Sequence, residues 1–276
     1  MKKFLNIFGR TKHNFWIITF FVLTCLFLYM IYLRMRGYTW QNWIGFENKT
    51  LWDWLSLVLL PLFVSGTVAL LEKSERKADR EIAEDNQREI ALQNYFDAMT
   101  TLILDKGLRN SKEDEEVRNI AQAKTTSTLR RLDAERKVKL VRFLSSLSLL
   151  EGFYQNRVFP IISLEGEDLS ETFLDEAQLK GVNMMGANLR YTDLSYTNLS
   201  GALLHSAILK NCTMEYTDLS NANLAFADLS DAILYNTKFI GAELRDVNLN
   251  NATYYKYTKW PEGFDPKAHG AILVSD

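Results

Sequence analysis

A large apolar residue stands at every fifth position of the C-terminal part of the chain, from Leu164 to Tyr254, and the phase never slips. A small residue lies two positions before most of these centres, and polar residues fill the other places in the pattern A(D/N)LSx. A period of five fits neither an α-helix, with its period of 3.6, nor a β-strand, with its period of two. We therefore expect the chain to turn once per unit and to stack on itself as a solenoid.

The centres and the small residues are expected to point inward and to form a stacked core with little room for a pocket. The core positions that define it best are Leu189, Leu194, Leu199, Leu219, Leu224, Leu229, Ala187, Ala222 and Ala227. Side chains just after the centres should face solvent, where they would be available to a partner. This candidate partner surface comprises Arg190, Tyr191, Tyr196, Tyr216, Phe226, Tyr235 and Arg245. Scattered exposed aromatics are also normal on proteins without a partner.

Two apolar stretches near the N-terminus have the length of membrane spans. Residues 15–33 contain no charge, and residues 54–71 are also uncharged and contain Pro61 and Gly66, which membrane helices tolerate. We predict transmembrane helices at both, with an external aromatic-rich loop at 34–53; the alternatives are a cleaved signal peptide for the first and a buried core helix for the second. Basic residues in the N-terminal segment 1–14 and after the second stretch place both termini in the cytoplasm.

Residues 72–152 have helical patterns and are predicted to form a long helix followed by a small cytoplasmic helical domain. The long helix is polar all round to about Glu89 and then carries an apolar face, with Leu92, Tyr95, Phe96, Met99, Leu102 and Ile103 at three-and-four spacing. Ser111 and Asp114 suggest a capping box for a second helix, whose stripe is Val117, Ile120, Ala121 and Leu132. Asp133 is positioned to cap a third helix.

Both ends of a solenoid need covering. The β-helix is expected to span residues 160–258, and Phe159, Ile161 and Ile162, which precede its first centre, Leu164, are expected to cover the exposed core of the first coil. Residues 259–276 break the period with two prolines, and they offer Trp260 and Phe264 as a lid for the other end.

The net charge of −2 conceals an uneven distribution of charge. Residues 162–276 carry 16 acidic and 8 basic side chains, so the net charge of this part is −8 and that of the remainder is +6. The two cysteines and three histidines are isolated, and the chain contains no phosphate-binding loop, nucleophile elbow or metal-binding motif. We expect no catalytic residues, no cofactor and no metal site, and therefore no enzyme.

The stretches ANLRYTDLSYTNLSGALL and NANLAFADLSDAIL resemble pentapeptide-repeat proteins. The resemblance implies a right-handed quadrilateral β-helix with four units per coil. A group of bacterial membrane proteins is similar over nearly all of the chain after residue 48, through KTLWDWLSLVLLPL, the helical stretch that begins ALQNYFDAMTTLIL, the repeats and WPEGFDP. This resemblance implies a multi-pass protein of the bacterial inner membrane, and it brings no established activity.

Three functions fit this layout. In the first, the β-helix is an oligomeric interaction or sensing module at the lipid bilayer, and it binds an unidentified cytoplasmic protein or ligand. In the second, the spans assemble into a pore or a permeabilising effector of a bacterial defence type, lined by Asp53, Ser56 and Thr67. In the third, the acidic rod imitates DNA and binds a topoisomerase, as some pentapeptide-repeat proteins do. Direct nucleic-acid binding is not expected, because an anionic lipid surface explains the basic residues.

Overall fold

The computed structural model describes residues 51–112, 115–152 and 160–274, without the side chains of residues 51–60 and Phe63. It divides into two compact units, Met1–Arg76 and Lys77–Asp276. The predicted N-terminal segment 1–14, the first span at 15–33 and most of the loop at 34–53 lie outside the described residues.

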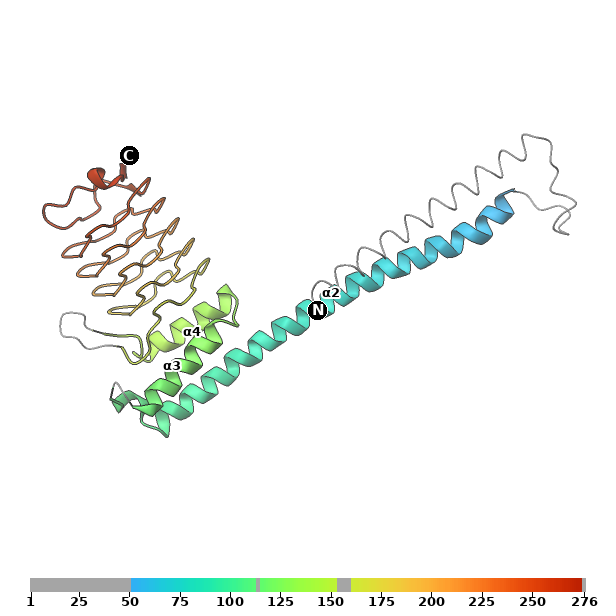
Figure 1. The fold of residues 1–276 in the computed structure, drawn as a ribbon, viewed down its shortest axis with the longest axis horizontal. Coiled ribbons are helices and arrows are strands. Elements are labelled where there is room, and N and C mark those ends of the chain that lie inside the picture. The colour runs from blue at the N-terminus through green and yellow to red at the C-terminus, as the bar shows by residue number, and fades with distance from the viewer. Residues whose placement is uncertain (1–50, 113–114, 153–159, 275–276) are drawn as a thin grey trace, which may run out of the picture. The chain divides into compact units, whose positions relative to one another are not determined.

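Helix α2, Leu51–Leu104, confirms that the second apolar stretch and the long polar stretch after it are helical (Figure 1). It begins before the predicted loop ends, so Trp52 and Asp53 are helical, and it contains Pro61. Its polar stretch carries ion pairs one turn apart, such as Glu72 with Arg76 at 3.3 Å. Among the residues described, no helix has a stretch long and apolar enough for a membrane crossing.

The C-terminal part of α2 packs with two short helices, α3 at Glu116–Leu129 and α4 at Ala134–Ser146, and a 3-10 turn, η2 at Leu108–Asn110, follows α2. The predicted apolar face of α2 is confirmed, since Leu92, Tyr95, Met99 and Leu102 are buried and Phe96 and Ile103 pack against them.

Two details of the predicted helices are wrong. Ile120 is exposed, and Thr125 lies inside instead, where its hydroxyl bonds that of Tyr95 at 2.8 Å. The Ser111 hydroxyl donates to Leu108 O rather than capping α3, which begins after Glu115. The cap of α4 is confirmed, because the Asp133 carboxylate accepts the Arg136 N–H at 3.0 Å.

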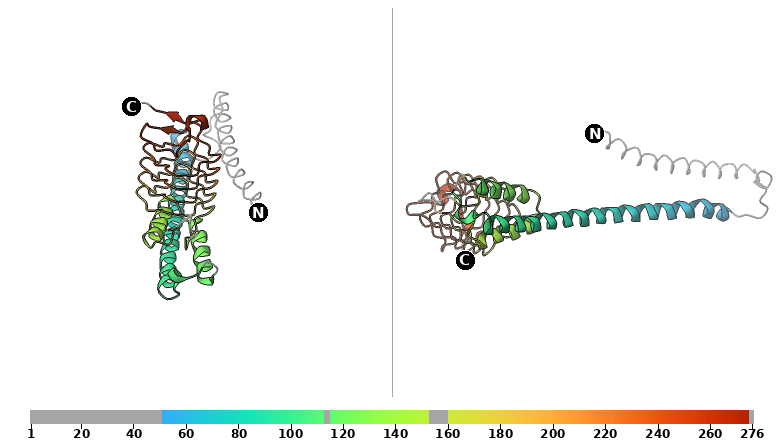
Figure 2. Two further views of the ribbon diagram at one scale, coloured as in Figure 1. Left: turned by 90° about the vertical axis from the view of Figure 1, so that its left-hand side faces the viewer. Right: turned by 90° about the horizontal axis from the view of Figure 1, so that it is seen from below.

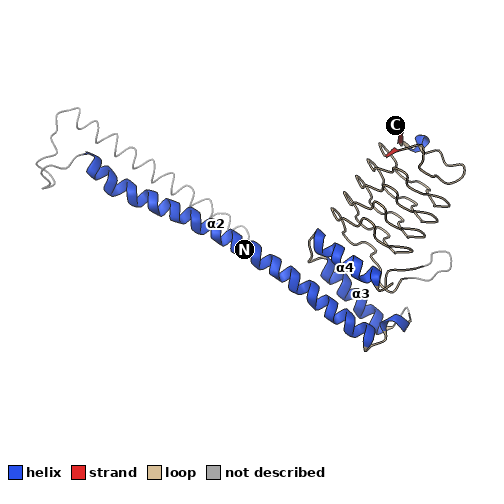
Figure 3. Ribbon diagram, turned by 180° about the vertical axis from the view of Figure 1, so that it is seen from behind, coloured by secondary structure: helices blue, strands red, loops and turns tan. Residues whose placement is uncertain are grey.

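Residues 164–260 form a four-sided β-helix with one coil for every twenty residues (Figure 3). Parallel bridges join each residue before a centre to its equivalent one coil later, from Asp168 with Asn188 to Ile233 with Thr253. Each side of a coil contributes only one bridging residue, so most of the β-helix is drawn as loop. The stacked coils are visible in the left view of Figure 2. The predicted five-residue solenoid is confirmed.

Helices α3 and α4 supply hydrogen-bond donors to the first coil of the β-helix. In later coils, the C=O before each centre accepts the N–H of a centre one coil earlier, as Asn183 O does from Leu164 at 2.8 Å. No coil precedes the first one, so side chains of the helices donate the hydrogen bonds to its carbonyl groups. Gln122 donates to Ser163 O at 2.8 Å, Lys137 donates to Asp168 O at 2.6 Å, and Ser145 donates to Gln178 O.

The helical region and the β-helix are therefore one structural unit. Their buried side chains form a single continuous core that runs from Leu92 to Ala271. The sequence predicted a helical domain and a solenoid as neighbouring parts, and it did not show that the first is the N-terminal cap of the second.

The C-terminal end is covered by Trp260, as predicted, but through an additional repeat unit. The last bridge, Lys238 with Lys259, spans 21 residues instead of twenty. One inserted residue thus precedes Trp260, which takes the place of a centre and stacks on Phe239 with ring centroids 4.7 Å apart. Strand β1, Thr253–Tyr254, pairs in parallel with β2, Ile272–Leu273, and a 3-10 turn, η3 at Lys267–His269, lies between them.

Candidate functional site

The turns between the sides of the β-helix determine which side chains reach solvent. In most units the N–H three residues after the centre donates to the centre's C=O, as Thr197 does to Leu194 at 3.1 Å. The second residue after the centre has a positive φ, between 53° and 70°, in every unit from Gly166 to Asn251. This geometry is that of a type II turn, which favours glycine or asparagine at the left-handed position.

Four aromatic residues occupy this left-handed position: Tyr191, Tyr196, Tyr216 and Phe226. Their relative exposures are 61%, 57%, 52% and 49%. A left-handed backbone costs an ordinary L-residue about 1–2 kcal/mol. Every unit has this backbone geometry, so the feature that makes these four residues candidates for a binding role is the exposed aromatic ring at a position that favours glycine or asparagine.

Three of the predicted partner residues come together on one edge of the β-helix. We call the turn residues 175–176, 195–196, 215–216, 235–236 and 255–256 the tyrosine edge. Tyr196 stacks on Tyr216 with centroids 5.1 Å apart and planes 7° from parallel, and Tyr235 stacks on Tyr255 at 3.9 Å and 14°. Sequence reasoning missed Tyr255 as a member, although its spacing of twenty from Tyr235 is the signal that identifies it.

The other predicted partner residues lie on two further edges. The Arg245 guanidinium lies 5.4 Å from the centre of the Phe226 ring, and the His205 ring meets the same ring edge-on at 5.3 Å. Arg190 and Tyr191 stand at the turn of another edge, where Lys210 pairs with Asp231 at 3.3 Å. The seven predicted residues therefore do not form one surface.

The tyrosine edge carries acidic residues at its first and third turns. Asp175, Glu176 and Glu215 are among its turn residues, and no lysine or arginine occurs at these turns before Lys256. Asp175 meets Arg142 of α4, whose guanidinium donates to Asp175 O at 2.8 Å and lies 3.5 Å from the carboxylate. This edge therefore combines stacked aromatic rings with negative charge.

The interior of the β-helix offers no binding cavity to a ligand. The nine predicted core residues are all buried, each with at most 1% exposure. Where threonine replaces the small alanine after the first coil, its hydroxyl donates to a carbonyl of the preceding coil, as Thr197 does to Leu174 O at 2.8 Å. Burial raises the pKa of the Cys212 thiol above its usual range. Within the described part of the chain, no group of three His, Cys, Asp or Glu side chains is placed to hold a metal ion.

The repeated Asp and Asn residues that precede the centres shape the turns, as their regularity predicts. Each accepts the N–H two residues later through Oδ1, for example Asp193 from Ser195 at 2.9 Å and Asp218 from Ser220 at 2.9 Å. These carboxylates therefore have a structural task, and they do not face one another as catalytic pairs do.

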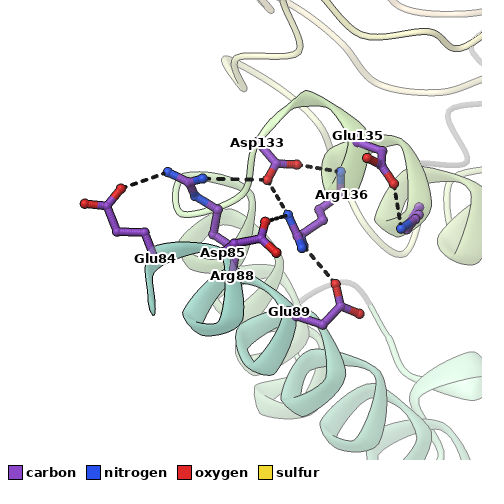
Figure 4. A network of polar contacts seen from close by, with 8 residues as sticks. Glu84, Asp85, Arg88, Glu89, Asp133, Glu135 and Arg136 are labelled. Atoms are coloured by element: carbon purple, nitrogen blue, oxygen red, sulfur yellow. Dashed lines mark hydrogen bonds and ion pairs between the residues drawn. The ribbon is translucent and has the colours of Figure 1, made fainter. Parts of the chain in front are cut away.

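A charged network joins α2 to the start of α4 (Figure 4). Arg136 lies at its centre, and its guanidinium contacts Asp85 at 2.9 Å, Glu89 at 2.9 Å and Asp133 at 2.6 Å. The Arg136 side chain is only 12% exposed. Hydrogen bonds to the three carboxylates raise the pKa of Arg136. Burial acts to raise the pKa of Asp133, but the hydrogen bonds and charge of Arg136 outweigh it, and the pKa is lowered.

The predicted pore-facing residues lie in α2. Thr67 donates its hydroxyl to Val64 O at 2.8 Å, within the same helix. Asp53 and Ser56 are helical, and their side chains lie outside the described part of the structure. The pore lining remains a prediction.

A closed core with turn residues displayed along its edges defines a repeat protein of the solenoid class. The pentapeptide repeat family matches with eight copies, over residues 163–201, 183–221 and 217–253. No curated protein matches the chain.

Several solved structures are similar to the repeat region. The pentapeptide repeat protein Rfr23 from the cyanobacterium Cyanothece 51142 is 30% identical, covering 39% of this chain and 69% of that one, with a TM-score of 0.33. The pentapeptide repeat protein alr5209 from Nostoc Pcc 7120 is 34% identical, covering 39% and 85%, with a TM-score of 0.26. QnrB1, a plasmid-mediated fluoroquinolone resistance protein, is 18% identical, covering 42% and 59%, with a TM-score of 0.27. The chain belongs to the pentapeptide repeat family.

Proposed function

We propose that this protein is a non-enzymatic interaction module of the bacterial inner membrane, and that its tyrosine edge docks a cytoplasmic protein. The observation that carries the proposal is the pair of stacked, half-exposed rings of Tyr196 and Tyr216 on strained turns. Tyrosine supplies a large contact area and a hydroxyl at little cost in conformational entropy, and it is enriched at interfaces.

The filled core directs binding to the outside of the β-helix. Leu and Ala side chains close the interior, so a ligand has only turns and flat sides to contact. A rigid rod with a fixed repeat suits docking, because its surface residues are held in position before the partner arrives.

The membrane part of the proposal rests on the apolar stretches at 15–33 and 54–71 and on the distribution of basic residues around them. Helix α2 contains the second stretch and continues into the polar residues 72–89. That polar stretch is the proposed meeting place of several copies of the chain. Both termini, and with them the β-helix, would be cytoplasmic.

Photo-crosslinking in cells tests the docking surface. We would place p-benzoylphenylalanine at position 216 and, in a matched control, at position 191, which has the same turn geometry on another edge. The proposal expects a defined adduct at 216 and none at 191. Equal labelling at both positions, or none at either, would contradict a docking role for the tyrosine edge.

Topology and copy number have separate tests. Alkaline phosphatase fused after Asp276 should be inactive, and an active fusion would refute the cytoplasmic C-terminus. Light scattering of the detergent-solubilised protein should give the mass of an oligomer, and a monomer would remove the proposed assembly through residues 72–89.

A further inference from the structure

We propose that the partner segment bound by the tyrosine edge is an extended, arginine-rich stretch of protein, whose guanidinium groups stack on Tyr196 and Tyr216 and pair with the carboxylates beside them. This inference rests on the proposed function, and it specifies the chemistry of the partner.

The protein's own Phe226 displays the contact that we infer. Its ring occupies the same left-handed turn position as Tyr196 and Tyr216, and the guanidinium of Arg245, nineteen residues later, lies 5.4 Å from the ring centre. Arginine binds aromatic faces through the quadrupole of the ring and through planar stacking. An aromatic ring on these turns is therefore an adequate platform for a guanidinium.

On the tyrosine edge, the equivalent position holds no cation. The residue nineteen positions after Tyr196 is Glu215, and the residue nineteen positions after Tyr216 is Tyr235. Neither Tyr196 nor Tyr216 has a cation over its ring among the described residues. The edge therefore lacks the internal arginine that covers Phe226. Tyr196 and Tyr216 cover one face of each other, and a guanidinium would stack on the opposite face of each half-exposed ring.

The negative charge of the edge favours a cationic partner. Glu176, Asp193 and Glu215 lie on this edge or on the side that leads into it, and none forms an ion pair with another described residue. The remaining carboxylate, Asp175, already receives the guanidinium of Arg142. The first turn of the tyrosine edge, at Asp175, therefore already binds an arginine side chain in the folded protein.

The spacing fits an extended segment. Adjacent coils are about 4.8 Å apart, so the edge from Glu176 to Tyr235 is about 14 Å long. Alternate side chains of an extended chain repeat every 6.8 Å or so, and three of them therefore cover the same length. Three alternate arginines would meet the two tyrosines and the three uncompensated carboxylates.

The test uses the full-length protein in nonionic detergent and three fluorescein-labelled octapeptides, with arginine, lysine or glutamate alternating with serine. Fluorescence anisotropy should show saturable binding of the arginine peptide. The lysine peptide should bind about fivefold more weakly, because an ammonium group does not stack. The glutamate peptide should not bind. Equal affinity for arginine and lysine would overturn the stacking, because simple charge attraction would then explain the binding.

Substitutions locate the site. Replacing Tyr196 and Tyr216 together with Asn removes both rings while keeping a residue that accepts the left-handed turn. This variant should bind the arginine peptide about tenfold more weakly, and Tyr191→Asn, the same change on another edge, should alter the affinity by less than about twofold. Equal losses in both, or an unchanged double variant, would overturn the proposal.

A charge variant keeps the test decisive if the double variant does not fold. Glu215→Gln should weaken arginine-peptide binding and reduce its salt dependence, whereas Glu171→Gln, on a different edge, should do neither. Equal effects of the two changes would place the peptide elsewhere.

Failure of this inference is distinguishable from failure of the proposed function. A crosslinked adduct at position 216 without arginine-peptide binding would retain the docking role and overturn the arginine-rich partner. The absence of both would overturn both.

Discussion

Tyr191→Asn is expected to stabilise the protein, although it removes a large aromatic side chain. Tyr191 has a φ of 59° and is 61% exposed, so its ring buries little area to offset the backbone strain. Its N–H donates to Lys210 O at 3.2 Å, and asparagine retains that bond. A left-handed tyrosine costs about 1–2 kcal/mol, and asparagine recovers roughly 0.5–1 kcal/mol of it.

Scanning calorimetry of the full-length protein measures this gain. For a unit of this size, 0.5–1 kcal/mol corresponds to a rise in Tm of about 1–4 °C. Tyr191→Val should lower the Tm, because a β-branched residue is the least suited to a positive φ. A lower Tm for Tyr191→Asn, or the same change for Asn and Val, would show that the turn geometry is not the source of the strain.

Tyr196 has the same left-handed backbone as Tyr191, but its ring also stacks on Tyr216, so a comparison of the two positions separates backbone strain from ring contact. In Tyr196→Asn the same relief is opposed by loss of the ring stack with Tyr216, which contributes about 0.5–1.5 kcal/mol. The Tm of Tyr196→Asn should therefore lie below that of Tyr191→Asn. The reverse order would mean that the stack contributes nothing to stability.

Three further changes test other parts of the structure. Gly181→Ala should be far more destabilising than Gly201→Ala, because an added Cβ would lie 1.8 Å from Gly152 O at Gly181 and would meet no atom within 4 Å at Gly201. Equal Tm values for the two variants would refute the close approach of Gly181 to Gly152. Arg136→Met should lower the free energy of unfolding in urea by about 2 kcal/mol, which lies between the values for exposed and buried ion pairs, because the carboxylate partners are themselves half-exposed. A decrease below about 0.5 kcal/mol would show that the network contributes little to stability. The lowered pKa of Asp133 stabilises the fold above the unfolded-state pKa near 4, and this contribution is lost as the pH falls through the lower folded-state value. Asp133→Asn should flatten the acid limb of the stability profile, and an unchanged limb would assign it to other carboxylates.

The core of the β-helix could be predicted because a five-residue period constrains every unit in the same way. Once the centres are aligned, Leu199 and Ala222 can point only inward. The phase also places Tyr196 and Tyr216 outside. Their common edge follows only when the coil length of twenty is applied to the turn residues as well as to the centres.

Other features depend on contacts that the period does not encode. One inserted residue before Trp260 shifts the phase, so the last unit looks like the end of the pattern. Arg136 lies 47 positions from Glu89, and nothing local indicates that the two side chains meet. The donors that α3 and α4 send to the first coil are likewise visible only when the helices are in place.

The order of the cap and the coils along the chain has a consequence for biogenesis. The helices that complete the first coil precede it in sequence, so they leave the ribosome before any repeat does. Each later coil adds twenty residues, which takes about 1–4 s of synthesis, and it pairs only with the coil just before it. Each new coil therefore pairs with a coil that has already folded, and the unpaired backbone groups of the last coil are exposed only until the next coil is synthesised. The contacts are local in sequence, so the nascent chain does not need the slow pairing of strands that lie far apart in the chain.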